Sequence, residues 1–115
     1  MEAYAIHKGA MIAPRKARMT MDLVRGKDVA TARNILENTN TKASRLILKV
    51  LNSAVANAVN NNGADEKDLV ISKCFINPGP IYKRIQFASR GNVDRHDKRT
   101  SHIVVYVTDN KEVTE

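Results

Sequence analysis

Two segments of the chain carry most of its cationic side chains, and cations at such density can bind a polyanion. Between residues 7 and 27, a single aspartate accompanies six cations: Lys8, Arg15, Lys16, Arg18, Arg25 and Lys27. Between residues 79 and 102, two aspartates accompany another six: Lys83, Arg84, Arg90, Arg95, Lys98 and Arg99. The remainder of the 115 residues is close to neutral, although the whole chain carries a formal charge of +7. The pattern favours binding of a nucleic acid, with a cationic surface that has no partner as the alternative.

The first basic segment coincides with the expected start of a helix. Pro14 suits the first helical position because its φ is fixed and its nitrogen carries no hydrogen. Apolar side chains follow at helical spacing, so we expect a helix over residues 14–25 that ends at Gly26. Cations in a first turn oppose the helix macrodipole, which favours an external phosphate at the free N–H groups. The cations concerned are Arg15, Lys16 and Arg18, and a plain solvated helix start is the other interpretation.

The second basic segment lies between two strand-like stretches, residues 69–76 and 102–107. Gly91-Asn92 near its centre is a two-residue hairpin signal. A turn centred there gives three facing pairs: Arg84 with Arg99, Phe87 with His96, and Ile81 with His102. Each arm would be roughly 33 Å long at about 3.3 Å per residue, against a body radius of about 13 Å. We therefore expect a hairpin over residues 80–102 that projects from the body.

An isolated ribbon of two strands is marginal in water, and like charges that face each other weaken it further. A partner that supplies anions would stabilise it. RNA does so, because its phosphates neutralise arginines and its unpaired bases stack on aromatic rings. The side chains predicted to stack are Tyr82, Phe87 and His96. A flexible basic loop is the alternative.

The remaining elements must hold these two segments in place. Residues 4–8 alternate as a strand does, Asp28 can cap a helix that stops near residues 38–40, and Thr41 can cap a longer helix that ends near Gly63. The order of elements predicts an α+β fold: three helices packed on a small antiparallel sheet, with a long protruding β-hairpin. The length suits a single domain over residues 1–115.

Other kinds of chemistry have little support. Cys74 has no cysteine to pair with, which fits a reducing compartment, and its apolar surroundings predict a buried small side chain. Asp94, His96, Asp97 and His102 do not converge in the expected register, and neighbouring cations would repel a metal ion. We therefore expect no metal, no cofactor and no enzymatic activity. The longest run of large apolar residues is 103–107, too short to cross a bilayer, and no signal peptide is visible.

Several motifs in order along the chain resemble one family. They are Ala-Pro-Arg-Lys-Ala-Arg at 13–18, Asp-Leu-Val-Arg-Gly-Lys at 22–27, Lys-Val-Leu-Asn-Ser-Ala-Val-Ala-Asn-Ala at 49–58, Gly79-Pro80, Lys83-Arg84, and Lys-Arg-Thr-Ser-His-Ile at 98–103. Together they resemble the universal large-subunit ribosomal protein twenty-two, in its bacterial form. The resemblance covers nearly the whole chain.

The resemblance implies a structural protein of the large ribosomal subunit in the cytoplasm. It implies partners as well: 23S-type ribosomal RNA, neighbouring ribosomal proteins and the nascent peptide, with no membrane. The protein would support subunit assembly, and its hairpin would reach the peptide exit tunnel, where the family carries macrolide-resistance changes. The tunnel-lining residues would be Tyr82, Phe87, Ala88, Ser89, Gly91, Asn92 and His96.

The sequence departs from the family pattern at the hairpin tip. The family usually has Pro-Arg-Ala-Arg-Gly-Arg-Ala where residues 87–93 read Phe-Ala-Ser-Arg-Gly-Asn-Val, so two customary arginines are absent. Ala13 also replaces the usual serine before the first helix. Two other functions stay open from the residues alone: a free-standing regulator that binds nucleic acid through its β-ribbon, and an enzyme that acts on RNA.

Overall fold

The structure is a computed structural model that describes residues 2–87 and 93–109, with the backbone alone described for residues 82–87 and 93–98. In chain order the elements are β1 (Glu2–Ala10), α1 (Pro14–Met21), α2 (Val29–Asn38), α3 (Lys42–Asn62), the short 3₁₀ helix η1 (Glu66–Asp68), β2 (Val70–Phe87) and β3 (Val93–Thr108).

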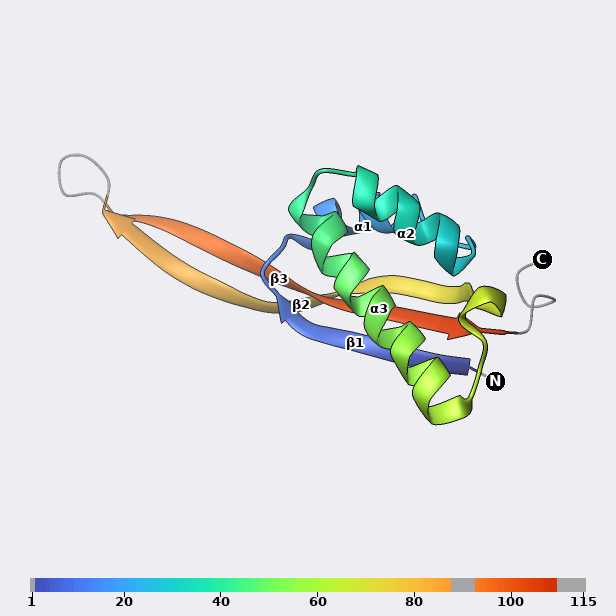
Figure 1. The fold of residues 1–115 in the computed structure, drawn as a ribbon. Helices are drawn as coiled ribbons and strands as arrows, with labels where there is room; N and C mark the ends of the chain where they lie inside the picture. The colour runs from blue at the N-terminus through green and yellow to red at the C-terminus, as the bar shows by residue number, and fades with distance from the viewer. Residues whose placement is uncertain (1, 88–92, 110–115) are drawn as a thin grey trace.

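The three strands form one antiparallel sheet in the order β1-β3-β2, so the last strand of the chain is the central one. Thr108 lies opposite Glu2 on one side and opposite Val70 on the other. The three helices lie on the same face of the sheet, with α3 running along β1 (Figure 1). This arrangement confirms the predicted α+β fold.

The core lies between α3 and the covered face of the sheet. Ile47 and Leu51 of α3 are buried, as are Ile103, Val105 and Val107 of β3. Alternate residues of a strand point to one face, which explains the spacing of the β3 residues. The small side chains of α3 that were expected to allow close packing are Ala54, Ala56 and Ala58; the first and last are fully buried and Ala56 is exposed.

The ends of α2 and α3 fall where the sequence predicts them. The Asp28 carboxylate accepts a hydrogen bond from the N–H of Thr31, 3.3 Å away, and so caps α2. Thr41 and Ser44 form a reciprocal capping box at the start of α3. Gly63 ends α3 with a φ of 66°, in the left-handed region that glycine adopts without strain.

Helix α1 ends at Met21, four residues before the predicted end at Arg25. From Leu23 onward the backbone N–H groups bond three residues back instead of four, to Thr20 and then Met21. Such tighter bonds are common at helix ends. The guanidinium of Arg25 also bonds to the carbonyl of Cys74 on β2, a contact that the local sequence pattern does not reveal.

Strands β2 and β3 continue beyond the helices as one long hairpin, as predicted (Figure 1). The molecule measures 61 × 26 × 22 Å, and its radius of gyration is 17.0 Å. A compact chain of this length would have a radius of gyration near 13 Å. The hairpin therefore makes the molecule elongated.

The predicted pairing within the hairpin is wrong by three residues. Arg84 lies opposite His96, Phe87 opposite Val93, and Ile81 opposite Arg99. Gly79 and Pro80 of β2 stand against Thr100 alone in a bulge, a site that proline in a strand favours, and this bulge shifts the pairing by one residue toward the predicted register. Five residues then separate the arms, and the predicted turn at Gly91-Asn92 lies outside the described residues. The expected repulsion between Arg84 and Arg99 does not arise in this register.

Candidate nucleic-acid interface

The first turn of α1 presents its cations to solvent. Ala13 stands at the cap position with φ −67° and ψ 134°, and no side chain caps the helix there. Pro14 occupies the first turn, which contains no acidic residue, and Arg15 and Lys16 are exposed. A helix start with cations and without an acidic cap has the polarity that suits a phosphate.

A groove joins this helix start to the base of the hairpin. It has a volume of about 200 Å³. Its lining includes Arg15 and Arg18 of α1, Ile81 of β2 and Arg99 of β3, and none of its lining residues is acidic. The two basic segments, predicted as separate RNA-binding regions, therefore meet in one place.

The strands approach closely at the bottom of this groove. A Cβ atom built on Gly79 would lie 2.5 Å from the hydroxyl oxygen of Thr100. That hydroxyl donates to the carbonyl of Pro80 at 2.6 Å. The bulge is thus held by one side chain, which fixes the direction in which the hairpin leaves the body.

Two arginines connect α1 and the turn after it to β2. Arg18 donates to the carbonyl of Ile76 at 3.3 Å, and Arg25 donates to the carbonyl of Cys74 at 3.2 Å. Arg25 also forms an ion pair with Asp22, and this hydrogen bond raises the pKa of the guanidinium. A guanidinium has five N–H donors, so Arg18 keeps donors for a phosphate in the groove. Arg25 is partly neutralised by its carboxylate partner.

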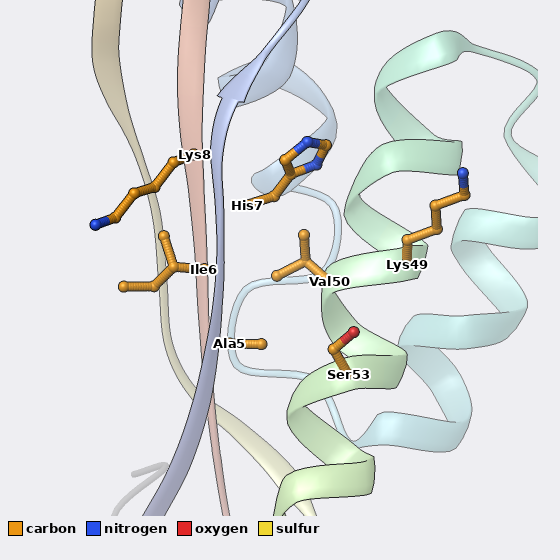
Figure 2. A pocket seen from close by; sticks show the side chains of 7 residues that line it. All are labelled: Ala5, Ile6, His7, Lys8, Lys49, Val50 and Ser53. Atoms are coloured by element: carbon orange, nitrogen blue, oxygen red, sulfur yellow. The ribbon is translucent and has the colours of Figure 1, made fainter.

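The other predicted cations of the first segment lie apart from this groove. Lys16 lines a neighbouring hollow with Met11 and Lys42, whose ammonium donates to the carbonyl of Met11 at 2.7 Å. Lys8 projects from β1 away from α3 (Figure 2). Lys27 lies at the far end of the body, because its carbonyl accepts from the N–H of Ile71 at the start of β2.

The hairpin residues are placed by their backbone alone. Tyr82, Lys83, Arg84 and Phe87 lie on the β2 arm, and Arg95, His96 and Lys98 lie on the β3 arm. The predicted tip residues Ala88, Ser89, Arg90, Gly91 and Asn92 lie outside the described residues. The interface built here therefore rests on the body and the base of the hairpin.

A second polar groove was missed by the sequence analysis. It has a volume of about 270 Å³ and lies between β1 and α3, where His7, Lys49 and Ser53 are among its lining residues (Figure 2). Figure 2 shows Ala5 and His7 pointing from β1 toward α3, whereas Ile6 and Lys8 point away. The alternation of β1 predicts the side to which His7 points, but its position across the groove from Lys49 depends on how α3 packs.

Other predicted absences concern metals and membranes. The carboxylates Asp94 and Asp97 belong to the hairpin arms, and the Nδ1 atom of His102 accepts from the N–H of Gly9 at 3.0 Å. Among the side chains that the structure describes, those of residues 2–81 and 99–109, no group of three metal-binding residues was found. Over the same part of the chain, no helix combines the length and the apolar character that a membrane crossing needs.

A comparison with known protein families gives a match over most of the chain. The family model described as Ribosomal protein L22p/L17e matches residues 5–108. The match therefore spans the three helices, both arms of the hairpin and the groove at its base.

Proposed function

The chain belongs to the ribosomal protein L22p/L17e family, and on this premise we propose how it acts in the large subunit. Membership makes it a structural protein of the ribosome that binds large-subunit ribosomal RNA, in a family that is not enzymatic. We propose that the basic groove at the base of the hairpin anchors the body on this RNA. The hairpin then extends to the nascent-peptide exit tunnel, and the anchored protein supports assembly of the subunit in the cytoplasm.

The groove is the observation that carries this proposal. Arg15 and Arg18 come from α1, and Arg99 comes from the hairpin, yet all three line one depression. Three cations without an acidic neighbour in the lining repel one another unless an anion lies between them. An RNA backbone supplies such anions at regular spacing, and binding through phosphates positions a protein without reading sequence.

The shape of the hairpin supports a role at a distance from this anchor. The arms extend well beyond the helices (Figure 1), and cations continue along both of them. All twelve cations predicted from the sequence stay candidates for RNA contact, with the seven predicted hairpin residues as candidates for the tunnel wall. A nascent peptide in the tunnel and neighbouring ribosomal proteins would then be further partners.

The salt dependence of RNA binding tests the anchor. If about 6–10 phosphates are contacted, the plot of log K against log salt for a large-subunit RNA fragment should have a slope of magnitude about 5–8. Arg15→Gln and Arg99→Gln should each reduce that magnitude by somewhat less than one unit. An affinity that hardly responds to salt would contradict the proposal.

Lys67→Gln is the matched control, since it removes the same charge at a different place. Lys67 lies in η1, between Glu66 and Asp68, just before β2 begins. Its substitution should leave the slope unchanged. An equal loss in all three variants would mean that the groove has no special role.

Deletion of residues 82–84 tests the tunnel. It removes three residues from one arm directly beyond the bulge, which shortens that arm by about 10 Å. It also reverses the side to which the following residues point, because strand alternation has period two. Cells whose only copy carries this deletion should assemble large subunits, seen in sucrose gradients, and should grow at higher macrolide concentrations. Normal subunits with unchanged drug sensitivity would contradict the placement of the hairpin in the tunnel wall.

A further inference from the structure

A hollow at the outer edge of β1 is not part of the groove described above. It has a volume of about 570 Å³. Tyr4 and Ile6 of β1 line it together with three asparagines at the end of α3 and with Glu2, the asparagines being Asn57, Asn61 and Asn62. Tyr4 is 52% exposed. Exposed aromatic side chains that gather beside polar groups commonly mark binding sites.

The ring of Tyr4 is the end of a row of three rings across the sheet. The centroids of Tyr4 and Tyr106 are 5.2 Å apart with an angle of 29° between the planes. Phe75 follows Tyr106 at 6.3 Å and 27°. Tyr106 therefore has a ring on both sides, whereas Tyr4 stands at the end of the row, beside the hollow that it helps to line. The stack holds its ring in place as a flat platform.

The asparagines supply hydrogen-bonding groups around that platform. Asn57 donates to the carbonyl of Tyr4 at 2.8 Å, which fixes the end of α3 against β1. Asn61 and Asn62 are exposed in the last turn of α3, and each side chain offers an acceptor and an N–H₂ donor. Amides of this kind match the edge of an adenine, with its ring-nitrogen acceptor and amino donor.

Cations lie on the same face of the sheet as the row of rings. Lys8 follows Tyr4 and Ile6 at alternate positions of β1 and points away from α3 (Figure 2). The ammonium of Lys73 lies 5.8 Å from the centre of the Tyr106 ring. A ligand on this face therefore meets a ring to stack on and ammonium groups beside it, and the hollow at the edge of β1 leads from Tyr4 to the amides at the end of α3.

We propose that an unpaired RNA base bearing an amino group, with adenine as the best fit, stacks on Tyr4 in this hollow. Asn61 and Asn62 bond to its edge, while Lys8 and Lys73 lie near the phosphates that flank it. This inference rests on the proposed function, since it needs ribosomal RNA as the partner. A basic protein segment fits less well, because it brings no anion to the two lysines.

Binding of short single strands to the full-length protein tests the proposal. The two probes are a nine-nucleotide adenosine RNA and an abasic strand of the same length and charge, compared by fluorescence anisotropy. One stacked base should make the adenosine strand bind about tenfold more tightly than the abasic strand. Tyr4→Leu should lose most of this preference, with its affinity for the abasic strand unchanged. Tyr4→Phe, which keeps the ring, should retain the preference.

A second variant keeps the test decisive if Tyr4→Leu alters folding. Asn61→Ala combined with Asn62→Ala changes only exposed side chains, and it should also reduce the preference for the adenosine strand. An undiminished preference in this variant and in a folded Tyr4→Leu protein would overturn the proposal and locate stacking elsewhere. So would a wild-type protein that binds both strands equally, or a dimer, seen by sedimentation, that Tyr4→Leu disperses. The Arg15 and Arg99 variants test RNA anchoring through the salt dependence of binding, whereas the Tyr4 variants test base stacking. One proposal can therefore be wrong while the other holds.

Discussion

At the scale of single residues, Gly79 is required by a contact and not by its backbone angles. Alanine there would place a Cβ atom 2.5 Å from the Thr100 hydroxyl oxygen and 3.3 Å from the backbone carbonyl carbon of Thr100. Because that hydroxyl is fixed by its bond to Pro80, it cannot move without loss of the bulge. We expect Gly79→Ala to lower the free energy of unfolding by about 1–3 kcal/mol, the usual cost of overpacking. Urea unfolding followed by circular dichroism measures this value.

Gly63→Ala serves as the comparison for that variant. Nothing lies within 4 Å of a Cβ atom at Gly63, but its φ of 66° strains any other residue. Comparison of the two variants therefore distinguishes the effect of a steric contact on stability, at Gly79, from the effect of backbone strain, at Gly63. Only Gly79→Ala should also weaken RNA binding, because it alone lies at the base of the hairpin. Equal RNA affinity in both variants would argue against a fixed hairpin direction.

Cys74 allows a prediction about pH. Burial raises the pKa of its thiol, and the nearby Arg25 guanidinium opposes this in part. The unfolded thiol thus ionises at a lower pH than the folded one. The stabilisation from this residue is complete below the unfolded pKa of about 8.5 and declines as pH rises through the folded pKa. Unfolding midpoints should fall less between about pH 7 and pH 10 in Cys74→Val than in the wild type.

At the scale of elements, α3 holds the body together. Leu51 is fully buried against the sheet, so Leu51→Ala should lower the free energy of unfolding by about 2–5 kcal/mol. Ala56→Ser changes an exposed position of the same helix and should cost no more than about 0.5 kcal/mol. Thermal melts of both variants measure the difference. Similar losses would mean that helix propensity, and not burial, governs the stability of α3.

The same scale shows what the sequence can predict. The starts and ends of α2 and α3 follow from local signals, such as Asp28, Thr41 and Gly63, which act within a few residues. The end of α1 does not, because Arg25 bonds to a carbonyl on β2, 49 residues away. The predicted hairpin register is wrong for a different reason: the arms end at Phe87 and Val93, so five residues connect them where Gly91-Asn92 predicts a two-residue turn.

The candidate site divides in the same way. Charge and spacing pointed to Arg15, Arg18 and Arg99 as RNA-binding residues. That all three line one groove is a result of tertiary packing, which the spacing of residues in the sequence does not predict. Tyr4 is a stronger example, because its platform requires rings from β2 and β3 and amides from α3.

At the scale of the whole molecule, the hairpin and the body should be separable in stability. The core consists of residues between Ala3 and Ile76 and between Ile103 and Val107, as far as side chains are described. In a variant in which a short Asn-Gly turn replaces residues 82–98, the free energy of unfolding should therefore stay within about 1 kcal/mol of the wild-type value. Differential scanning calorimetry measures this, and the variant should bind RNA more weakly. A loss above about 2 kcal/mol would mean that the hairpin contributes to the core.

The position of β3 in the sheet also sets an order of events during synthesis. Among the three strands that the structure describes, β1 and β2 each pair with β3 and lie on opposite sides of it. Because β3 (Val93–Thr108) follows the helices and both other strands in the chain, a ribosome must translate as far as Thr108 before the complete sheet can form. Formation of the sheet is then delayed until β3 has been synthesised, and until then the edges of β1 and β2 stay open to aggregation or to capture by a chaperone.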